Sequence, residues 1–138
     1  MLTYNNQTGA LPELPDWSNK KVLVVEDVEN NYELIEAILK KTKIKIVWAR
    51  TGNQAMLVFS EQTDIDIILM DIKLPDINGL DLTRQIKEKN KEIPIIAQTA
   101  YALTGDREKT ITAGCDAYLS KPLPKAKLLK VMSDFIGK

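Results

Sequence analysis

Apolar runs that alternate with amphipathic segments constrain the fold of this chain more than any other feature of its sequence. Strand-like runs, rich in valine and isoleucine, are expected at 21–26, 44–49, 65–71, 94–100 and 116–121. Helical segments are expected at 29–42, 52–62, 78–89, 104–114 and 125–137. Buried strands that alternate with helices indicate a parallel sheet covered on both faces, so we expect a five-stranded α/β fold.

Composition excludes several classes of function. The 138 residues suit one domain, and 19 basic against 19 acidic residues give no electrostatic argument for a nucleic-acid partner. No apolar run approaches the roughly 20 residues of a membrane span, so we expect no direct membrane insertion. Cys115 is the single cysteine and excludes an internal disulfide. The chain has no histidine, which removes the commonest general base, the commonest zinc ligand and any phosphohistidine of its own.

The first 19 residues show no sustained period and contain two prolines. We expect residues 1–19 to be an N-terminal tail or linker and residues 20–138 to be the domain. The alternative to a free tail is that Trp17 packs against the domain.

Polar residues gather where the expected strands end. They are Glu26, Asp27, Asp71, Thr99 and Lys121, and Ala100 stands beside Thr99 at the end of the fourth strand. The carboxyl ends of parallel strands meet at one edge of a sheet, where sites of such folds lie. Three carboxylates without a histidine or thiolate form a hard oxygen site that suits Mg²⁺. A lysine and a hydroxyl beside it suit a phosphoryl group, and the set describes phosphoryl transfer to an aspartate.

Each of these residues also has an ordinary structural interpretation. Glu26 and Asp27 could favour the N-terminus of the next helix, and Asp71 could be a solvated loop acid. Lys121 could be a surface cation, and Thr99 a plain strand-end threonine. The order and spacing of the acids and the lysine favour the functional interpretation.

Four segments of the chain resemble, in order, the motifs of the receiver domain of two-component response regulators. They are VLVVEDVENN, IILMDIKLPDINGLDL, IIAQTAYA and GCDAYLSKPL. The resemblance covers about residues 20–138. It implies a flavodoxin-like, doubly wound sheet with strand order 2-1-3-4-5 and helices on both faces.

The resemblance also implies roles for individual residues. Asp71 would be the phosphoacceptor. Asp27 would bind Mg²⁺ directly, Glu26 would do so directly or through water, and Asp71 and the backbone carbonyl of Lys73 would complete the metal ligands. Lys121 would pair with the phosphoryl group or with Asp71.

Further roles concern the switch. Thr99 and the amide of Ala100 would hold phosphoryl oxygens, and the Lys121–Pro122 peptide would be cis. Tyr118 occupies the switch-aromatic position, which moves inward when the threonine shifts, although simple packing is the alternative. Lys73 and Tyr101 stand where family members tune self-dephosphorylation, in a direction that the sequence leaves open.

The function implied is a phosphoacceptor receiver domain in a two-component phosphorelay, phosphorylated by a histidine kinase or a histidine phosphotransfer domain. Such a domain catalyses its own phosphorylation and dephosphorylation without being a turnover enzyme alone. We expect a cytoplasmic location, either as the C-terminal receiver of a hybrid sensor histidine kinase, which we favour, or as a stand-alone regulator. The alternatives are an inactive receiver-like scaffold and a Mg²⁺-dependent aspartyl-phosphate phosphatase. Such a phosphatase needs a second aspartate where this chain has Lys73.

Overall fold

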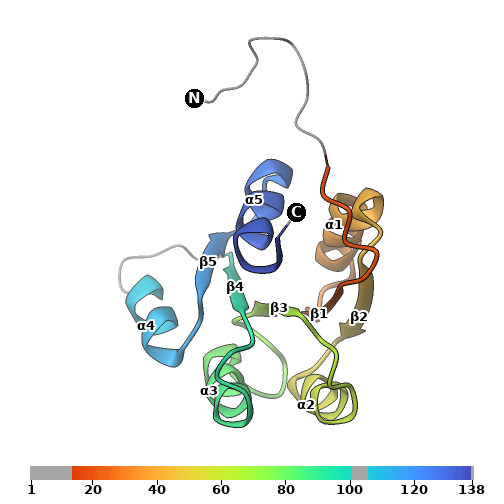
Figure 1. The fold of residues 1–138 in the computed structure, drawn as a ribbon. Helices are drawn as coiled ribbons and strands as arrows, with labels where there is room; N and C mark the ends of the chain where they lie inside the picture. The colour runs from red at the N-terminus through yellow and green to blue at the C-terminus, as the bar shows by residue number, and fades with distance from the viewer. Residues whose placement is uncertain (1–13, 101–105, 138) are drawn as a thin grey trace.

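The computed structural model describes residues 14–100 and 106–137 (Figure 1). Its sheet has five parallel strands in the order β2-β1-β3-β4-β5, which confirms the predicted fold and strand order. The strands are β1 (Lys21–Val25), β2 (Lys45–Ala49), β3 (Ile67–Asp71), β4 (Ile95–Thr99) and β5 (Ala117–Ser120). The α-helices are α1 (Glu29–Leu39), α2 (Gly52–Glu61), α3 (Gly79–Lys89), α4 (Asp106–Ala113) and α5 (Lys125–Ile136). A short 3-10 helix, η1 (Lys40–Thr42), follows α1.

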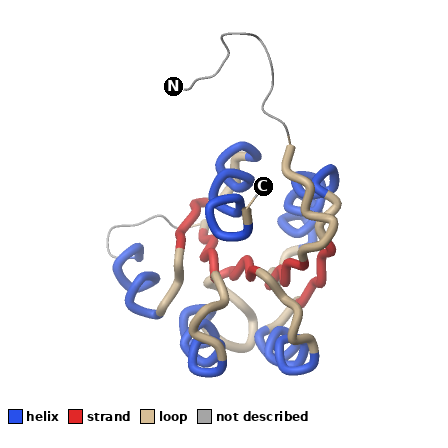
Figure 2. Tube along the Cα trace, viewed as in Figure 1, coloured by secondary structure: helices blue, strands red, loops and turns tan. Residues whose placement is uncertain are grey.

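The helices form two layers around the sheet, as Figures 1 and 2 show. Helices α1 and α5 cover one face, and α2 and α3 cover the other. Successive strand residues point to opposite faces, so Val22 and Val24 pack with the α1/α5 layer while Leu23 and Val25 pack with the other. This burial on both faces explains why the strands are apolar at nearly every position.

The sheet register aligns the carboxyl ends of the central strands. Met70 pairs with Val25, and Asp71 pairs with Gln98. Thr99 pairs with Ser120 at the same edge. The residues that follow β1, β3, β4 and β5 therefore meet at one end of the sheet, where the sequence predicts the site.

Trp17 belongs to the hydrophobic core. It is only 1% exposed and packs in the α1/α5 layer. Its backbone N–H donates to the carbonyl of Thr42 at 2.7 Å, and its indole Nε1 donates to the carbonyl of Gly137 at 2.7 Å. The alternative that Trp17 packs against the domain is thus confirmed, while a domain boundary at residue 20 stays a prediction.

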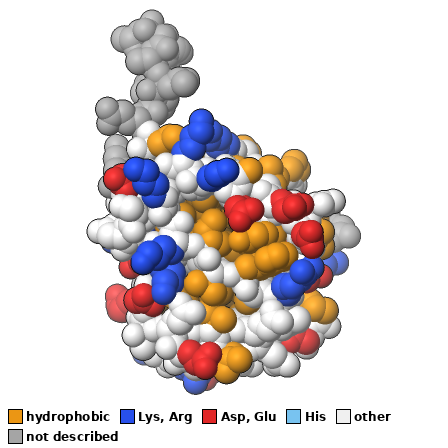
Figure 3. Space-filling view, turned by 90° about the vertical axis from the view of Figure 1, so that its right-hand side faces the viewer, with side chains coloured by type: hydrophobic (Ala, Val, Ile, Leu, Met, Phe, Trp, Pro, Cys, Tyr) orange, Lys and Arg blue, Asp and Glu red, His pale blue; other side chains and the backbone are white. Residues whose placement is uncertain are grey.

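The surface beside the edge strand β2 is partly apolar. Figure 3 shows hydrophobic side chains gathered across the face that carries α1, β2 and α2, with charged side chains around them. Ile46, Val47 and Trp48 of β2 are half-buried.

Among the described helices, none is long and apolar enough to cross a bilayer.

Candidate functional site

Three carboxylates converge at the carboxyl edge of the sheet. Glu26 and Asp27 directly follow β1, and Asp71 is the last residue of β3. One carboxylate oxygen from each lies within 4.8 Å of the others. Glu26 is fully buried, Asp71 is 4% exposed and Asp27 is half-buried. Residues 44 positions apart in sequence thus form one acidic cluster, as the motif spacing predicts.

Lys121 supplies the positive charge of this cluster. Its Nζ lies 2.8 Å from Oε1 of Glu26 and 3.3 Å from Oδ2 of Asp71. Lys121 follows β5, and its backbone N–H donates to the carbonyl of Thr99 at 2.7 Å. The Lys121–Pro122 peptide is cis, as the resemblance implies. One ammonium therefore faces two buried carboxylates at 2.8 and 3.3 Å, and the cluster retains a negative charge when all three acids are ionised.

Burial and the neighbouring charge make Asp71 a weaker acid than usual. The pKa of Asp71 is raised to about 7, chiefly by desolvation and then by the negative charge of Glu26. The charge of Lys121 and the backbone N–H of Lys73, which donates to Oδ1 at 3.1 Å, oppose this rise. The carboxylate of Asp71 is thus held at an energetic cost, which a further cation at the cluster would relieve.

Glu26 is held by bonds at both its backbone and its side chain. The amide of Val28 donates to Oε2 at 3.1 Å, while Oε1 accepts from Lys121. The indole Nε1 of Trp48 donates to the backbone carbonyl of Glu26 at 2.8 Å. We did not foresee this role of Trp48, because a tryptophan in a strand-like run carries no sequence signal for a bond to a neighbouring strand end.

The loop between β3 and α3 closes tightly behind Asp71. The amide of Gly79 donates to the carbonyl of Ile72 at 2.7 Å. A Cβ at Gly79 would collide with the backbone carbonyl of Asp71 and with Cα of Ile72. The backbone of Gly79 is not left-handed, so the residue is not required for an unusual turn conformation. Gly79 is needed because α3 begins against the backbone of the phosphoacceptor candidate.

The remaining predicted residues that the structure describes lie on or just after β3, β4 and β5. Thr99 ends β4 and is 3% exposed, and Ala100 follows it at the surface. The side chain of Lys73 is exposed. Tyr118 is half-buried on β5, packs with the α2/α3 layer and pairs with Ala97. Tyr101 lies outside the described residues.

The donor set fits a magnesium ion. All three candidate ligands are carboxylate oxygens, which hard cations prefer, and the one charge of Lys121 does not neutralise three of them. A site of this kind keeps coordination positions for water and for phosphate oxygens. The residues present can therefore hold a divalent cation and a phosphoryl group beside Asp71.

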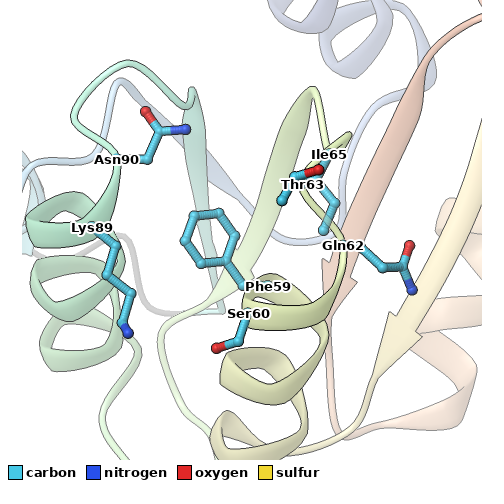
Figure 4. Close-up of a pocket in the computed structure, with 7 residues that line it drawn as sticks. All are labelled: Phe59, Ser60, Gln62, Thr63, Ile65, Lys89 and Asn90. Atoms are coloured by element: carbon cyan, nitrogen blue, oxygen red, sulfur yellow. The ribbon is translucent and has the colours of Figure 1, made fainter.

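A pocket of about 360 Å³ lies elsewhere on the molecule. Phe59, Thr63, Ile65 and Asn90 are among its lining residues, near the C-terminal ends of α2 and α3 (Figure 4). None of the clustered acids lines it. The candidate site is thus marked by its charges and not by the volume of a cavity.

The family model of the response regulator receiver domain matches residues 22–133. A curated relative, the polar-differentiation response regulator DivK of Brucella ovis, is 36% identical over 120 residues, which are 86% of this chain and 97% of the relative.

Solved structures share the fold. The receiver domain of the sensor histidine kinase PA1611 from Pseudomonas aeruginosa has a TM-score of 0.79 and 38% identity, over 86% of this chain and 98% of that chain. It was solved with a magnesium ion coordinated in its active site cleft. The receiver domain of the Saccharomyces cerevisiae response regulator Ssk1, solved with the histidine phosphotransfer signaling protein Ypd1, has a TM-score of 0.79 and 28% identity. This match covers 90% of this chain and 91% of that chain.

Proposed function

The chain belongs to the response regulator receiver domain family, and from that premise we propose that Asp71 is the residue that accepts the phosphoryl group. The observation that carries this proposal is the buried cluster of Glu26, Asp27 and Asp71 with Lys121 against two of its carboxylates. Asp71 is the member that combines a strand-end position with contact to both Lys121 and the Lys73 amide.

In the transfer step, a carboxylate oxygen of Asp71 attacks the phosphorus of a phosphohistidine. The P–O bond forms while the P–N bond breaks. The electron pair of the P–N bond goes to the ring nitrogen, and the imidazole leaves neutral because its other nitrogen carries a proton. Lys121 is 3.3 Å from Asp71 and can follow the negative charge onto the phosphoryl oxygens. The site contributes positioning and charge compensation, and it needs no further covalent step.

Mg²⁺ would be held by the side chains of Glu26, Asp27 and Asp71 and by the backbone carbonyl of Lys73. When bound, it supplies charge neutralisation for Asp71 and for the phosphoryl oxygens. The rise in the pKa of Asp71 that burial and Glu26 cause supports this proposal, because a cation at the cluster favours the ionised, nucleophilic form.

Thr99 and the amide of Ala100 would bind the phosphoryl oxygens, since Thr99 ends the strand that pairs with β3 and Ala100 follows it. Tyr118 would then move inward when Thr99 shifts, which would change the surface beside β5. Lys73 and Tyr101 would set the lifetime of the phosphoryl group. The exposure of the Lys73 side chain supports this role, because an exposed lysine can reach the path of an attacking water.

The partner would be a histidine kinase or a histidine phosphotransfer domain in the cytoplasm. The chain has no histidine, so the donor group must come from elsewhere. The Ssk1 receiver domain, solved with a histidine phosphotransfer protein, supports this class of partner. Membership of a hybrid sensor kinase, the context of the PA1611 receiver, stays a prediction.

Intact-mass spectrometry with acetyl phosphate tests the function. We expect one phosphoryl group to be gained in Mg²⁺, and none in EDTA or in the Asp71→Asn variant. A chain that gains no phosphoryl group under any of these conditions would favour the inactive scaffold. Release of inorganic phosphate from unrelated monoesters would favour the phosphatase.

A further inference from the structure

Asp76 connects the loop after Asp71 to a neighbouring helix. The loop comprises residues 72–78, between β3 and α3. Oδ1 of Asp76 accepts the backbone N–H of Gly52 at 2.8 Å, and Oδ2 accepts that of Asn53 at 2.9 Å. One carboxylate thus binds the first two amides of α2, which have no acceptor within their own helix. These two bonds lower the pKa of Asp76, so it stays ionised at neutral pH.

Close packing accompanies these bonds. A Cβ at Gly52 would collide with Cγ2 of Ile77 and would lie 3.3 Å from Oδ1 of Asp76. The tip of the loop therefore rests directly on the first residue of α2, which must be glycine for this approach. Thr51 caps the same helix independently, because its Oγ1 accepts the amide of Gln54 at 3.1 Å.

The base of the loop is fixed by backbone bonds. The amide of Ile72 donates to the carbonyl of Gln98 at 3.2 Å, and Lys73 forms a bridge with Asn78. The side chain of Asp76 joins this loop to α2, because it accepts the amides of Gly52 and Asn53. The segment between Lys73 and Asn78 is thus linked to α2 by the hydrogen bonds of Asp76 and by the packing of Ile77 on Gly52.

We propose that Asp76 is a positioning residue for the metal and phosphoryl site, which it serves without touching either group. Its bonds to α2 hold the tip of loop 72–78, and together with the backbone bonds at the base they fix the orientation of the Lys73 backbone. The inference rests on the proposed function, in which the Lys73 carbonyl is a metal ligand. Mg²⁺ demands near-ideal octahedral geometry, so a loop free to pivot binds it less tightly.

The test compares two ways of removing a cap from α2. Asp76→Ala frees the loop and removes two acceptors, while Thr51→Ala removes one acceptor of the same helix and leaves the loop attached. Mg²⁺ alone is titrated against the intrinsic fluorescence of each full chain, and thermal unfolding is followed without Mg²⁺. Asp76→Asn, which keeps one acceptor oxygen, is the milder variant.

We expect Asp76→Ala to raise the Kd for Mg²⁺ on the order of 10-fold, the usual cost of losing an outer-shell support. Thr51→Ala should lower Tm and leave the Kd unchanged, and Asp76→Asn should lie between Asp76→Ala and the unmodified chain in Kd. An unchanged Kd in Asp76→Ala with a lowered Tm would make Asp76 a helix cap only and overturn the inference. An unmodified chain that binds no Mg²⁺ would overturn the proposed function as well.

Discussion

Lys121 Nζ is 2.8 Å from Oε1 of Glu26, a fully buried carboxylate. Lys121 follows β5 and Glu26 follows β1, and these two strands lie three positions apart in the sheet. The same ammonium is 3.3 Å from Asp71. Both carboxylates are removed from water, and this pairing compensates their charge. The ammonium of Lys121 therefore compensates charge on two carboxylates at once.

Removing Lys121 should leave two buried carboxylates without their partner. We expect Lys121→Met to destabilise the protein by about 3–5 kcal/mol at pH 8 without Mg²⁺, the usual cost of breaking a buried pair. Millimolar Mg²⁺ should restore part of the loss. Urea unfolding with and without Mg²⁺ measures both effects. Lys130→Met is the matched control, because its partner Asp134 is exposed and the pair contributes little.

The raised pKa of Asp71 predicts a pH dependence of stability. Because the folded pKa is about 7 and the unfolded value is near 4, the folded state binds the proton more tightly. Stability from this group is therefore present at low pH and is lost as pH rises toward about 7. Asp71→Asn should flatten that slope and stabilise the protein on the order of 1–3 kcal/mol at pH 8. The free energy of unfolding of both proteins is measured by chemical denaturation from pH 5 to pH 8. If it changes equally with pH in the variant and in the unmodified chain, Asp71 is not the cause of the pH dependence.

Much of the site could be predicted because its residues stand at strand ends. Glu26, Asp27, Asp71 and Lys121 follow apolar runs, and parallel strands bring such positions to one edge of the sheet. Gly79, Asp76 and Trp48 could not be assigned in this way. Their roles depend on the distance between a loop and a helix or between two strands, which periodicity does not encode. Trp17 was left between two alternatives for the same reason, since its burial depends on contacts with Thr42 and Gly137.

Gln98 is a buried amide that the sequence did not single out. Its side chain is 2% exposed, and neither amide atom has a hydrogen-bond partner among the described residues. Replacing such a group with an apolar one of similar shape removes a desolvation penalty. Gln98→Leu should therefore raise the free energy of unfolding by about 1–2 kcal/mol, as measured in urea.

The control for this prediction is Gln54→Leu. Oε1 of Gln54 accepts the amide of Arg50 at 2.7 Å, so its loss should destabilise slightly. A lower stability of Gln98→Leu would mean that the amide has a partner, such as an ordered water, in solution.

Trp48 should report metal binding through its bond to Glu26. Mg²⁺ at the carboxylates changes the field around the Glu26 carbonyl, which accepts the indole N–H at 2.8 Å. Trp17, by contrast, lies at the amino end of β1 and bonds to Thr42 and Gly137. We expect Mg²⁺ to change the fluorescence of Trp17→Phe but not that of Trp48→Phe. The reverse pattern would place the ion away from Glu26.

The most direct measurement locates the phosphoryl group within the chain. The protein is phosphorylated with acetyl phosphate in Mg²⁺ and reduced with borohydride, which converts an aspartyl phosphate to homoserine. Peptide mass spectrometry then identifies the modified residue. The account predicts homoserine at position 71, with Glu26 and Asp27 unchanged. Modification at Asp27, or at a carboxylate outside the cluster while Asp71 stays intact, would contradict it.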